Sequence, residues 1–464
     1  MGSPADAADL RSRAQVRRWG SKAAHGLTRR SQPPPTPFHD LRTMRRLRNA
    51  WAVVRTNGLA SKSRDTRKRV AEFEPDAATH LKRISDQLRR GRFHFQKATG
   101  IPIEKKTAGS YRPIVVAPVE NSVVQRALLD VLTDQPGIER FLASSTSFGA
   151  VRTRGVPQAI AAAARAIRDG FVYYVRSDIA SFFMNIDRAR ALAQIADAVG
   201  DVRLMEVLEP ATATELANLA QLRNAGHAHL FPTHDVGVAQ GCALSPLLGN
   251  VLLHEFDVAM NGAGIICLRY VDDVLILGRE LRRVRKALRS AKDRLGKLGL
   301  DLYDPDEAPD KAEAGHCTDS GLEFLGCMVS YRSIRPTRKK RHELVETVKD
   351  IFRESYKAMA DPLALRDREA AIAQTLLKVN NVVQGWGNQY AFCNDRGGMQ
   401  DLDRKIDELV TSYLRGCARR RELLPADRAA DDWRRLLGVH LLADSKHTPI
   451  IKSPSQQGQH DSTQ

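Results

Sequence analysis

Two adjacent aspartates lie where a short hairpin would expose them. Asp272 and Asp273 stand between two apolar runs, 265–270 and 274–277, a pattern that predicts two strands with charge at their tip. Successive side chains of a strand point to opposite faces, so we expect unequal roles, with Asp272 the metal ligand and Asp273 its weaker partner. Taken alone, the string also fits an ordinary polar turn, since Tyr-x-Asp-Asp arises by chance in roughly one such chain in twenty-five.

A third carboxylate, Asp178, ends a predicted strand at 171–177. A carboxylate that ends a buried strand is costly unless it is paired, hydrogen-bonded or bound to a metal. If the strands are neighbours, the three carboxylates converge. Two Mg²⁺ ions need such oxygen ligands, because each keeps octahedral coordination and shares its other positions with water and substrate phosphate. One ion would activate an attacking 3′-hydroxyl and the other would stabilise leaving pyrophosphate, which is polymerase chemistry, with Mn²⁺ as a substitute.

The overall charge of the chain favours a polyanionic partner. The 464 residues include 72 Lys and Arg against 54 Asp and Glu, a formal net charge of +18. Nucleic acid is the first candidate, although a solvated basic surface is the alternative. The six cysteines form no Cys-x-x-Cys pair, which favours a reducing cytosol over a zinc site. No apolar leader or membrane-length run occurs, so we expect a soluble cytoplasmic protein without a membrane partner.

Four motifs occur in the order typical of reverse transcriptases, and further segments on both sides match. They are Ser177-Asp-Ile-Ala-Ser-Phe-Phe183, Gln240-Gly-Cys-Ala-Leu-Ser-Pro246, Tyr270-Val-Asp-Asp273 and Phe324-Leu-Gly326, with Ile101-Pro-Ile-Glu-Lys-Lys, Tyr111-Arg-Pro-Ile, Ser147-Phe-Gly149 and Gln384-Gly-Trp-Gly-Asn-Gln-Tyr390 around them. From about residue 44 to about residue 420 the chain resembles the reverse transcriptases of group II introns and their stand-alone bacterial relatives. The chain differs from the intron enzymes after its first helix, where they typically carry a Gly- and Asp-rich turn and this chain has Gly58-Leu-Ala-Ser-Lys-Ser-Arg-Asp. This difference puts intron recognition in doubt.

The resemblance implies an α+β right-hand polymerase fold, in which fingers and a palm with an antiparallel sheet precede an all-helical thumb. Helical periodicity at 44–57, at 77–88 and from about 337 to about 421 agrees with this arrangement. The expected segments are a basic, disordered leader (1–40), an N-terminal extension with fingers (41–170), a palm (171–336), a thumb or maturase-like domain (337–421), and a C-terminal extension with a disordered tail (422–464).

The resemblance also assigns roles to individual residues. The implied metal ligands are Asp178, Ile179, Asp272 and Asp273; the implied substrate-binding residues are Lys106, Arg112, Phe183, Gln240 and Gly241; and Lys311 is the implied proton donor to pyrophosphate. A ring at Phe183 would clash with a ribose 2′-hydroxyl and so favour deoxynucleotides. Each role has a plain alternative: surface charge for the lysines, core packing for Phe182 and Phe183, and for 240–246 an ordinary loop before a helix capped by Ser245.

The function implied is RNA-templated DNA synthesis from dNTPs. The expected partners are an RNA template, which a cognate structured non-coding RNA could supply, and a DNA product or primer. A bacterial retroelement or an antiphage defence system would each suit such an enzyme, and the motifs favour neither. The alternative is an RNA-binding, maturase-like protein that helps a structured RNA to fold or splice. An RNA-dependent RNA polymerase shares the palm chemistry, and Phe183 weighs against it.

Overall fold

The computed structural model describes residues 36–105, 109–232, 236–262, 264–317, 321–359, 371–422 and 437. The predicted disordered leader and tail lie almost entirely outside these ranges. Within them, helices alternate with antiparallel strands, which confirms the predicted α+β class. None of the described helices is both long and apolar enough to span a membrane.

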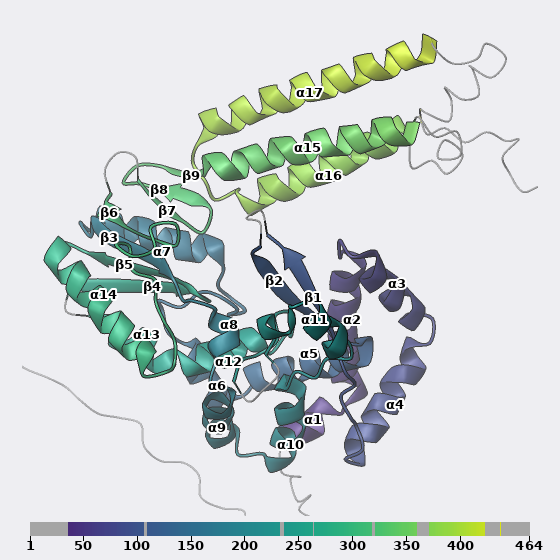
Figure 1. Ribbon diagram of the computed structural model, residues 1–464, viewed down its shortest axis with the longest axis vertical. Helices are drawn as coiled ribbons and strands as arrows, with labels where there is room; N and C mark the ends of the chain where they lie inside the picture. Colours follow the sequence, from purple (N-terminus) through teal and green to yellow (C-terminus); the bar gives the residue numbers. More distant parts are fainter. Residues whose placement is uncertain are drawn as a thin grey trace, which may run out of the picture. The chain divides into compact units, whose positions relative to one another are not determined.

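The chain begins with helices, and most of its strands come later (Figure 1). The helices before the central sheet are α1 (Pro37–Leu41), α2 (Met44–Leu59), α3 (Arg64–Phe73), α4 (Ala77–Arg89), α5 (Val119–Thr133), α6 (Pro136–Leu142) and α7 (Val156–Arg168). The later helices are α8 (Phe182–Asn185), α9 (Arg188–Val199), α10 (Val202–Thr212), α11 (Leu219–Asn224), α12 (Ser245–Leu252), α13 (His254–Ala259), α14 (Leu281–Gly296), α15 (Arg338–Met359), α16 (Ile372–Gln389) and α17 (Arg396–Glu422). The strands are β1 (Thr99–Glu104), β2 (Tyr111–Val116), β3 (Tyr173–Asp178), β4 (Ile265–Tyr270), β5 (Asp273–Gly278), β6 (Ala312–His316), β7 (Leu322–Phe324), β8 (Cys327–Val329) and β9 (Ile334–Pro336).

The central sheet has the strand order β4-β5-β3-β6, and all neighbours are antiparallel. Both faces are buried, because alternate residues of β3 and β5 enter different clusters. Val175 and Ile276 pack with the apolar side of α14, whereas Tyr174 and Leu275 pack with α7. Fully burying one such aliphatic side chain stabilises the fold by about 1.5–3 kcal/mol. The sheet is therefore held rigidly on two sides, and its strand ends are fixed in space.

The N-terminal helices pack against α5, and a separate hairpin follows α4 along the chain. Thr43 caps α2 by accepting a hydrogen bond from the backbone N–H of Arg46, and Leu47 and Trp51 of α2 are buried. Strands β1 and β2 pair antiparallel, with Glu104 opposite Tyr111. The loop joining them includes residues 106–108, so Lys106 lies outside the described residues. The predicted helices at 44–57 and 77–88 are present as α2 and α4.

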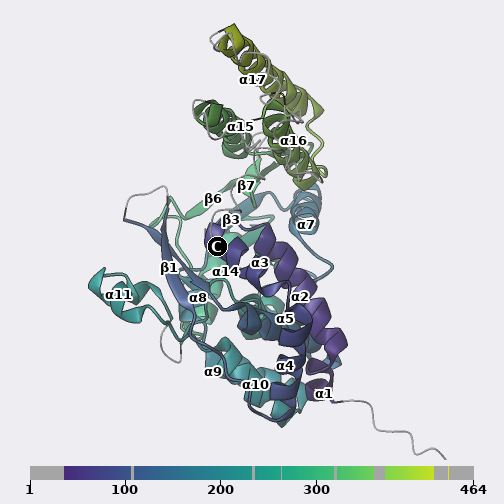
Figure 2. The same ribbon diagram turned by 90° about the vertical axis from the view of Figure 1, so that its right-hand side faces the viewer.

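The helical region predicted after residue 337 consists of α15, α16 and α17, which run side by side in two perpendicular views (Figures 1 and 2). Their apolar stripes form one core that includes Val348, Phe352 and Tyr413. Tyr390, at the end of α16, packs against Phe324 and Cys327 of the small sheet β7-β8-β9. The all-helical unit expected to follow the palm is thus present.

One local prediction is wrong. Ser245 does not cap α12; it is the first residue of the helix, and the capping position is held by Leu244. The Ser245 hydroxyl instead donates a hydrogen bond to the carbonyl of Ala239, at 2.8 Å. Because that bond ties the start of α12 to the preceding loop, Ser245 fixes the loop rather than the helix N–H groups. Pro246 does lie in the first turn, as predicted.

Candidate active site

The Asp272–Asp273 turn is a two-residue hairpin loop between β4 and β5. Tyr270 pairs with Asp273, which leaves Val271 and Asp272 as the loop. Val271 has a φ of 60°, a conformation that β-branched residues rarely adopt. Such strain costs on the order of 1–3 kcal/mol and persists only where the surroundings fix the backbone. The turn is therefore held in place by its neighbours rather than by its own preference.

Asp178 lies directly beside this turn. In the register of β3 and β5, Asp178 is opposite Asp273, and the N–H of Ile179 donates to the carbonyl of Asp272 at 3.0 Å. The side chains of Asp178 and Asp273 lie close together. Burial, and then this contact with Asp178, raise the pKa of Asp273 to about 8. The three carboxylates thus converge from two adjacent strands.

Asp272 differs from Asp273 in its surroundings. Burial and the charge of Asp178 raise the pKa of Asp272, while its own backbone N–H and the guanidinium groups of Arg112 and Arg269 lower it. Asp272 and Asp178 line a cavity of about 770 Å³, and Asp273 is absent from its lining. The asymmetry expected from the sequence therefore has a structural counterpart.

Most of the residues singled out from the sequence line this one cavity. Those present are Arg112, Asp178, Ile179, Phe183, Gln240, Gly241, Asp272 and Lys311, together with Lys105. Arg112, Lys105 and Lys311 are exposed, so their cationic ends are available to a bound anion. The lining thus combines carboxylates with cations, which suits a metal-bound polyphosphate.

The two phenylalanines of the Ser-Phe-Phe motif differ in burial. Phe182 is 3% exposed and packs so closely that a Cβ on Gly249 would lie 2.7 Å from its ring. Phe183 is only partly buried and lines the cavity, with its ring centroid 5.3 Å from that of Phe182. Both rings line the cavity, and Phe183 is the more exposed of the two.

Gln240 and Gly241 connect the β1–β2 hairpin to the cavity. The N–H of Val115 in β2 donates to the carbonyl of Gln240 at 2.8 Å. Gly241 has a φ of 115°, and a Cβ there would lie 2.6 Å from the carbonyl oxygen of Val115. Both facts require glycine. The close approach is thus between two backbone segments, and it ties the hairpin to the segment that lines the cavity of Asp178 and Asp272.

A buried arginine, not anticipated from the sequence, holds the turn. Arg269 and Asp257 are 1% and 2% exposed at their side chains and form a two-pronged pair at 2.6 and 2.7 Å. The remaining guanidinium N–H groups donate to Asn250, to the Ser147 hydroxyl and to the carbonyl of Val271, at 2.8–3.1 Å. All five N–H donors of the side chain are satisfied. A charged residue inside the apolar run 265–270 was the available clue.

Gly149 completes the support of the turn. A Cβ on Gly149 would lie 2.5 Å from Cγ2 and 2.6 Å from the backbone nitrogen of Val271. The carbonyl of Gly149 accepts a hydrogen bond of 2.9 Å from the Asn250 amide. The segment 147–149 therefore lies directly against the strained turn, and only glycine leaves room for it.

The carboxylates suit a divalent metal chemically, because carboxylate oxygens are the ligands that such ions prefer. Asp178 has one buried carboxylate oxygen without a hydrogen-bond partner, the kind of atom that an ion would satisfy. Among the described residues, no group of three or more Asp, Glu, His or Cys side chains is arranged to hold a metal ion.

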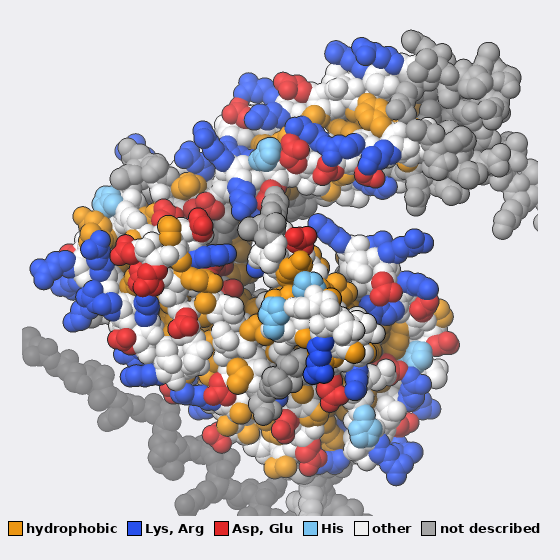
Figure 3. Space-filling view, in the orientation of Figure 1, with side chains coloured by type: hydrophobic (Ala, Val, Ile, Leu, Met, Phe, Trp, Pro, Cys, Tyr) orange, Lys and Arg blue, Asp and Glu red, His pale blue; other side chains and the backbone are white. Residues whose placement is uncertain are grey.

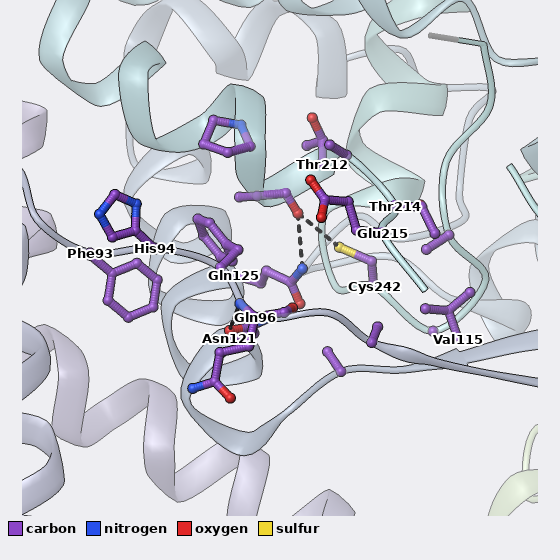
Figure 4. A pocket seen from close by; sticks show the side chains of 18 of the residues that line it. Phe93, His94, Gln96, Val115, Asn121, Gln125, Thr212, Thr214, Glu215 and Cys242 are labelled. Carbon is purple, nitrogen blue, oxygen red and sulfur yellow. Dashed lines mark hydrogen bonds between the residues drawn. The ribbon is translucent and has the colours of Figure 1, made fainter. Parts of the chain in front are cut away.

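A second cavity, of about 400 Å³, shares Gly241 and Cys242 with the first; Figure 4 shows it from close by. Its lining includes the amides of Asn121 and Gln125, and the Gln125 amide donates to the carbonyl of Ala211 at 2.9 Å. None of the three aspartates lines it. The cavity that holds the aspartates is therefore the candidate active site.

Comparison with known proteins places these features in a family. Residues 103–329 match the family model described as reverse transcriptase (RNA-dependent DNA polymerase). Protein YkfC of Escherichia coli (strain K12) is 27% identical over 186 residues, 39% of this chain and 45% of that protein. The group II intron-encoded protein LtrA of Lactococcus lactis subsp. cremoris is 25% identical over 181 residues, 38% of this chain and 27% of that protein. The chain thus spans less than half the length of these curated relatives.

Among solved structures, a chain of a partial Cas6-RT-Cas1–Cas2 complex aligns with 56% of this chain and 41% of its own length. The identity is 21% and the TM-score 0.33, too low to support any argument about function. The family match indicates the class, because residues 103–329 are similar to the reverse transcriptase family. The curated relatives include a group II intron-encoded protein, which confirms the resemblance drawn from the motifs.

Proposed function

We propose that this protein is a reverse transcriptase that copies an RNA template into DNA from dNTPs. The observation that carries the proposal is the convergence of Asp178 and Asp272 with Arg112 and Phe183 around one cavity. That cavity belongs to the segment that matches the reverse transcriptase family. Since the matched relatives are longer than the shared region, the activity of the whole chain is an inference from this site.

Within the cavity, different residues of the chain would bind different parts of the nucleotide. Arg112 and Lys311, with Lys106 from the adjoining hairpin loop, would hold the triphosphate, because an arginine fork and a lysine ammonium both bind phosphate oxygens. Lys311 would then protonate the leaving pyrophosphate. The ring of Phe183 would lie beneath the sugar and exclude a 2′-hydroxyl. Gln240 and Gly241 would form the wall against which the incoming nucleotide lies.

Asp178, Asp272, Asp273 and the backbone carbonyl of Ile179 would hold two divalent ions, Mg²⁺ or Mn²⁺. When bound, such ions activate a primer 3′-hydroxyl and stabilise the charge that develops on pyrophosphate. Ionised carboxylates are the ligands, so the raised pKa of Asp273 means that metal binding should strengthen as the pH rises.

We further propose that the protein works in the cytoplasm, as part of a bacterial retroelement or of a defence system against phages. Its partners would be a structured RNA that supplies the template and a DNA product or primer. The basic composition and the helical unit α15–α17 also suit an RNA-folding role of the maturase kind, which is the second candidate.

The test is purification of the protein with its bound RNA, followed by Mg²⁺-dependent incorporation of dNTPs. Wild type should incorporate dNTPs into a product complementary to the RNA, and the double substitution Asp272→Ala with Asp273→Ala should abolish this without releasing the RNA. Incorporation retained by the double variant would refute the assignment of the site. RNA folding assisted equally by both proteins, without any DNA product, would favour the maturase-like function.

A further inference from the structure

The outward face of helix α14 carries an unusual density of positive charge. Among its sixteen residues, seven are Lys or Arg and one is Asp, and Lys297 follows directly. Figure 3 shows the corresponding blue surface over α14, at the left of the view. Net charge on a surface follows from composition alone in many proteins, so the arrangement and pairing of these side chains must decide whether they form a binding surface.

The apolar side of α14 is fully used by the fold. Val284, Ala287, Leu288, Ala291 and Leu295 are buried against the palm sheet and its neighbours. Spacings of three and four residues place them on one side of the helix. A basic amphipathic helix can lie on a membrane only if its apolar face is free to insert. Since this face is covered, attraction by the cations is the interaction left to the helix.

The cations form a line on the opposite side. Arg282, Lys286, Arg289 and Lys297 are all exposed, and their spacings of four, three and eight residues keep them on one side of the helix. Asp293 lies in the same line. At 1.5 Å per residue the line from Arg282 to Lys297 is about 22 Å long. That length suits several consecutive phosphates of one nucleic-acid strand.

These side chains lack intramolecular partners. Among the residues that the structure describes, Arg282, Lys286 and Arg289 form no ion pair or hydrogen bond. Elsewhere exposed cations stand beside acids, as Arg89 does with Asp86 at 2.7 Å. Like charges four residues apart repel and destabilise a helix by about 0.2–0.5 kcal/mol per pair. A bound polyanion would relieve that repulsion.

The surface is separate from the proposed catalytic cavity. No residue of α14 lines the cavity that holds Asp178 and Asp272. The helix lies along the palm sheet, against β3 and β5, and its outward face is directed away from that sheet. A template–primer duplex at the carboxylates therefore leaves this face free for a second contact.

We propose that the face of α14 formed by Arg282, Lys286, Arg289 and Lys297 binds the phosphate backbone of a helical RNA segment outside the template–primer duplex. The identity of the polyanion as RNA rests on the proposed function, because RNA is the polyanion that such an enzyme handles. The contacts are to phosphates, so binding is strongly salt-dependent and insensitive to sequence.

The test uses the full-length protein already loaded with a short template–primer, so that the catalytic cleft is occupied. Binding of a fluorescent RNA hairpin without a primer is then measured by anisotropy over a range of salt concentrations. The variant is Arg282→Gln/Lys286→Gln/Arg289→Gln. The matched control, Arg45→Gln/Lys68→Gln/Arg89→Gln, removes the same charge from exposed cations that each stand within 3.7 Å of a carboxylate.

We expect the α14 variant to lose about 2–3 from the slope of log affinity against log salt, since each phosphate contact contributes about 0.7–0.9. At physiological salt this corresponds to a loss of up to about 100-fold in affinity for the hairpin. The control should bind as wild type does, and Asp293→Asn should bind more tightly. Primer extension on the short template–primer should be equal in all four proteins.

Several results would overturn the inference. Hairpin binding by the α14 variant that equals wild type or the control would mean that the charge is only a solvated surface. A matching loss of primer extension would place the helix in the catalytic cleft. Loss of binding to anionic phospholipid vesicles with hairpin binding intact would assign the face to a membrane surface. Absence of primer extension in wild type would instead refute the proposed function.

Discussion

Replacing Gly149 by alanine should impair catalysis more than folding, because an added Cβ would press directly on the turn that carries Asp272. The new Cβ would lie 2.5 Å from Cγ2 and 2.6 Å from the backbone nitrogen of Val271, where ordinary contacts begin at 3.4 Å. The turn must therefore retreat by about 0.8 Å, an overpacking that typically costs about 1–3 kcal/mol. A displacement of about 1 Å at reacting groups can cost about 100-fold in rate.

We expect Gly149→Ala to lower the single-turnover rate of nucleotide addition by about 100-fold, with little change in the apparent affinity for dNTP. The loss of folding free energy, measured by denaturant titration, should stay within about 1–3 kcal/mol. Gly155→Ala is the matched control, because its Cβ would meet no atom nearer than 3.6 Å. A normal rate in Gly149→Ala, or an equal defect in Gly155→Ala, would refute the view that segment 147–149 fixes the turn.

Three further predictions concern the site and its support. Phe183→Ala should raise the incorporation of ribonucleotides relative to deoxynucleotides. Phe182→Ala should leave sugar selectivity unchanged and cost about 3–5 kcal/mol of stability. Unchanged selectivity in Phe183→Ala would contradict the proposed role of its ring beneath the sugar. Because the pKa of Asp273 is raised to about 8, the metal-free native state binds more protons than the unfolded chain between about pH 4 and pH 8. The melting temperature should therefore fall from pH 5 to pH 8, and Asp273→Asn should lose most of that dependence. A melting temperature that rises with pH, or a profile that Asp273→Asn leaves unaltered, would count against the raised pKa. Asp257→Asn should cost about 3–5 kcal/mol in denaturant unfolding, since Arg269 would be left as a buried unpaired charge, and a cost below about 1 kcal/mol would show that the pair is dispensable.

The helices and strands, and the order of the site motifs along the chain, could be predicted from the sequence because both depend on local patterns. The apolar runs on either side of Asp272 predicted strands that form the hairpin, and helical periodicity predicted α2 and α4. Asp272 and Asp273 do differ in their surroundings, since only Asp272 lines the cavity, but the reason is that Asp272 lies in the loop whereas Asp273 begins β5.

Long-range packing could not be predicted in the same way. Arg269 interacts with Asp257, Asn250 and Ser147, up to 122 residues away, and no local pattern announces such a partner set. Gly149 was recognised only as part of a family motif, and its physical reason is a contact with Val271 in the folded state. The hydroxyl of Ser245 was misassigned for the same cause, because a cap and a tie to a preceding loop look alike in sequence.

The central claim is that Asp178 and Asp272 hold divalent ions at the reacting phosphate. It is tested most directly by electron paramagnetic resonance of Mn²⁺ in a complex of the protein with a chain-terminated primer, an RNA template and the next dNTP. We predict bound Mn²⁺ in wild type, and its loss in Asp178→Asn and in Asp272→Asn while both variants still bind the template–primer. Mn²⁺ binding of equal affinity in all three proteins would contradict the account.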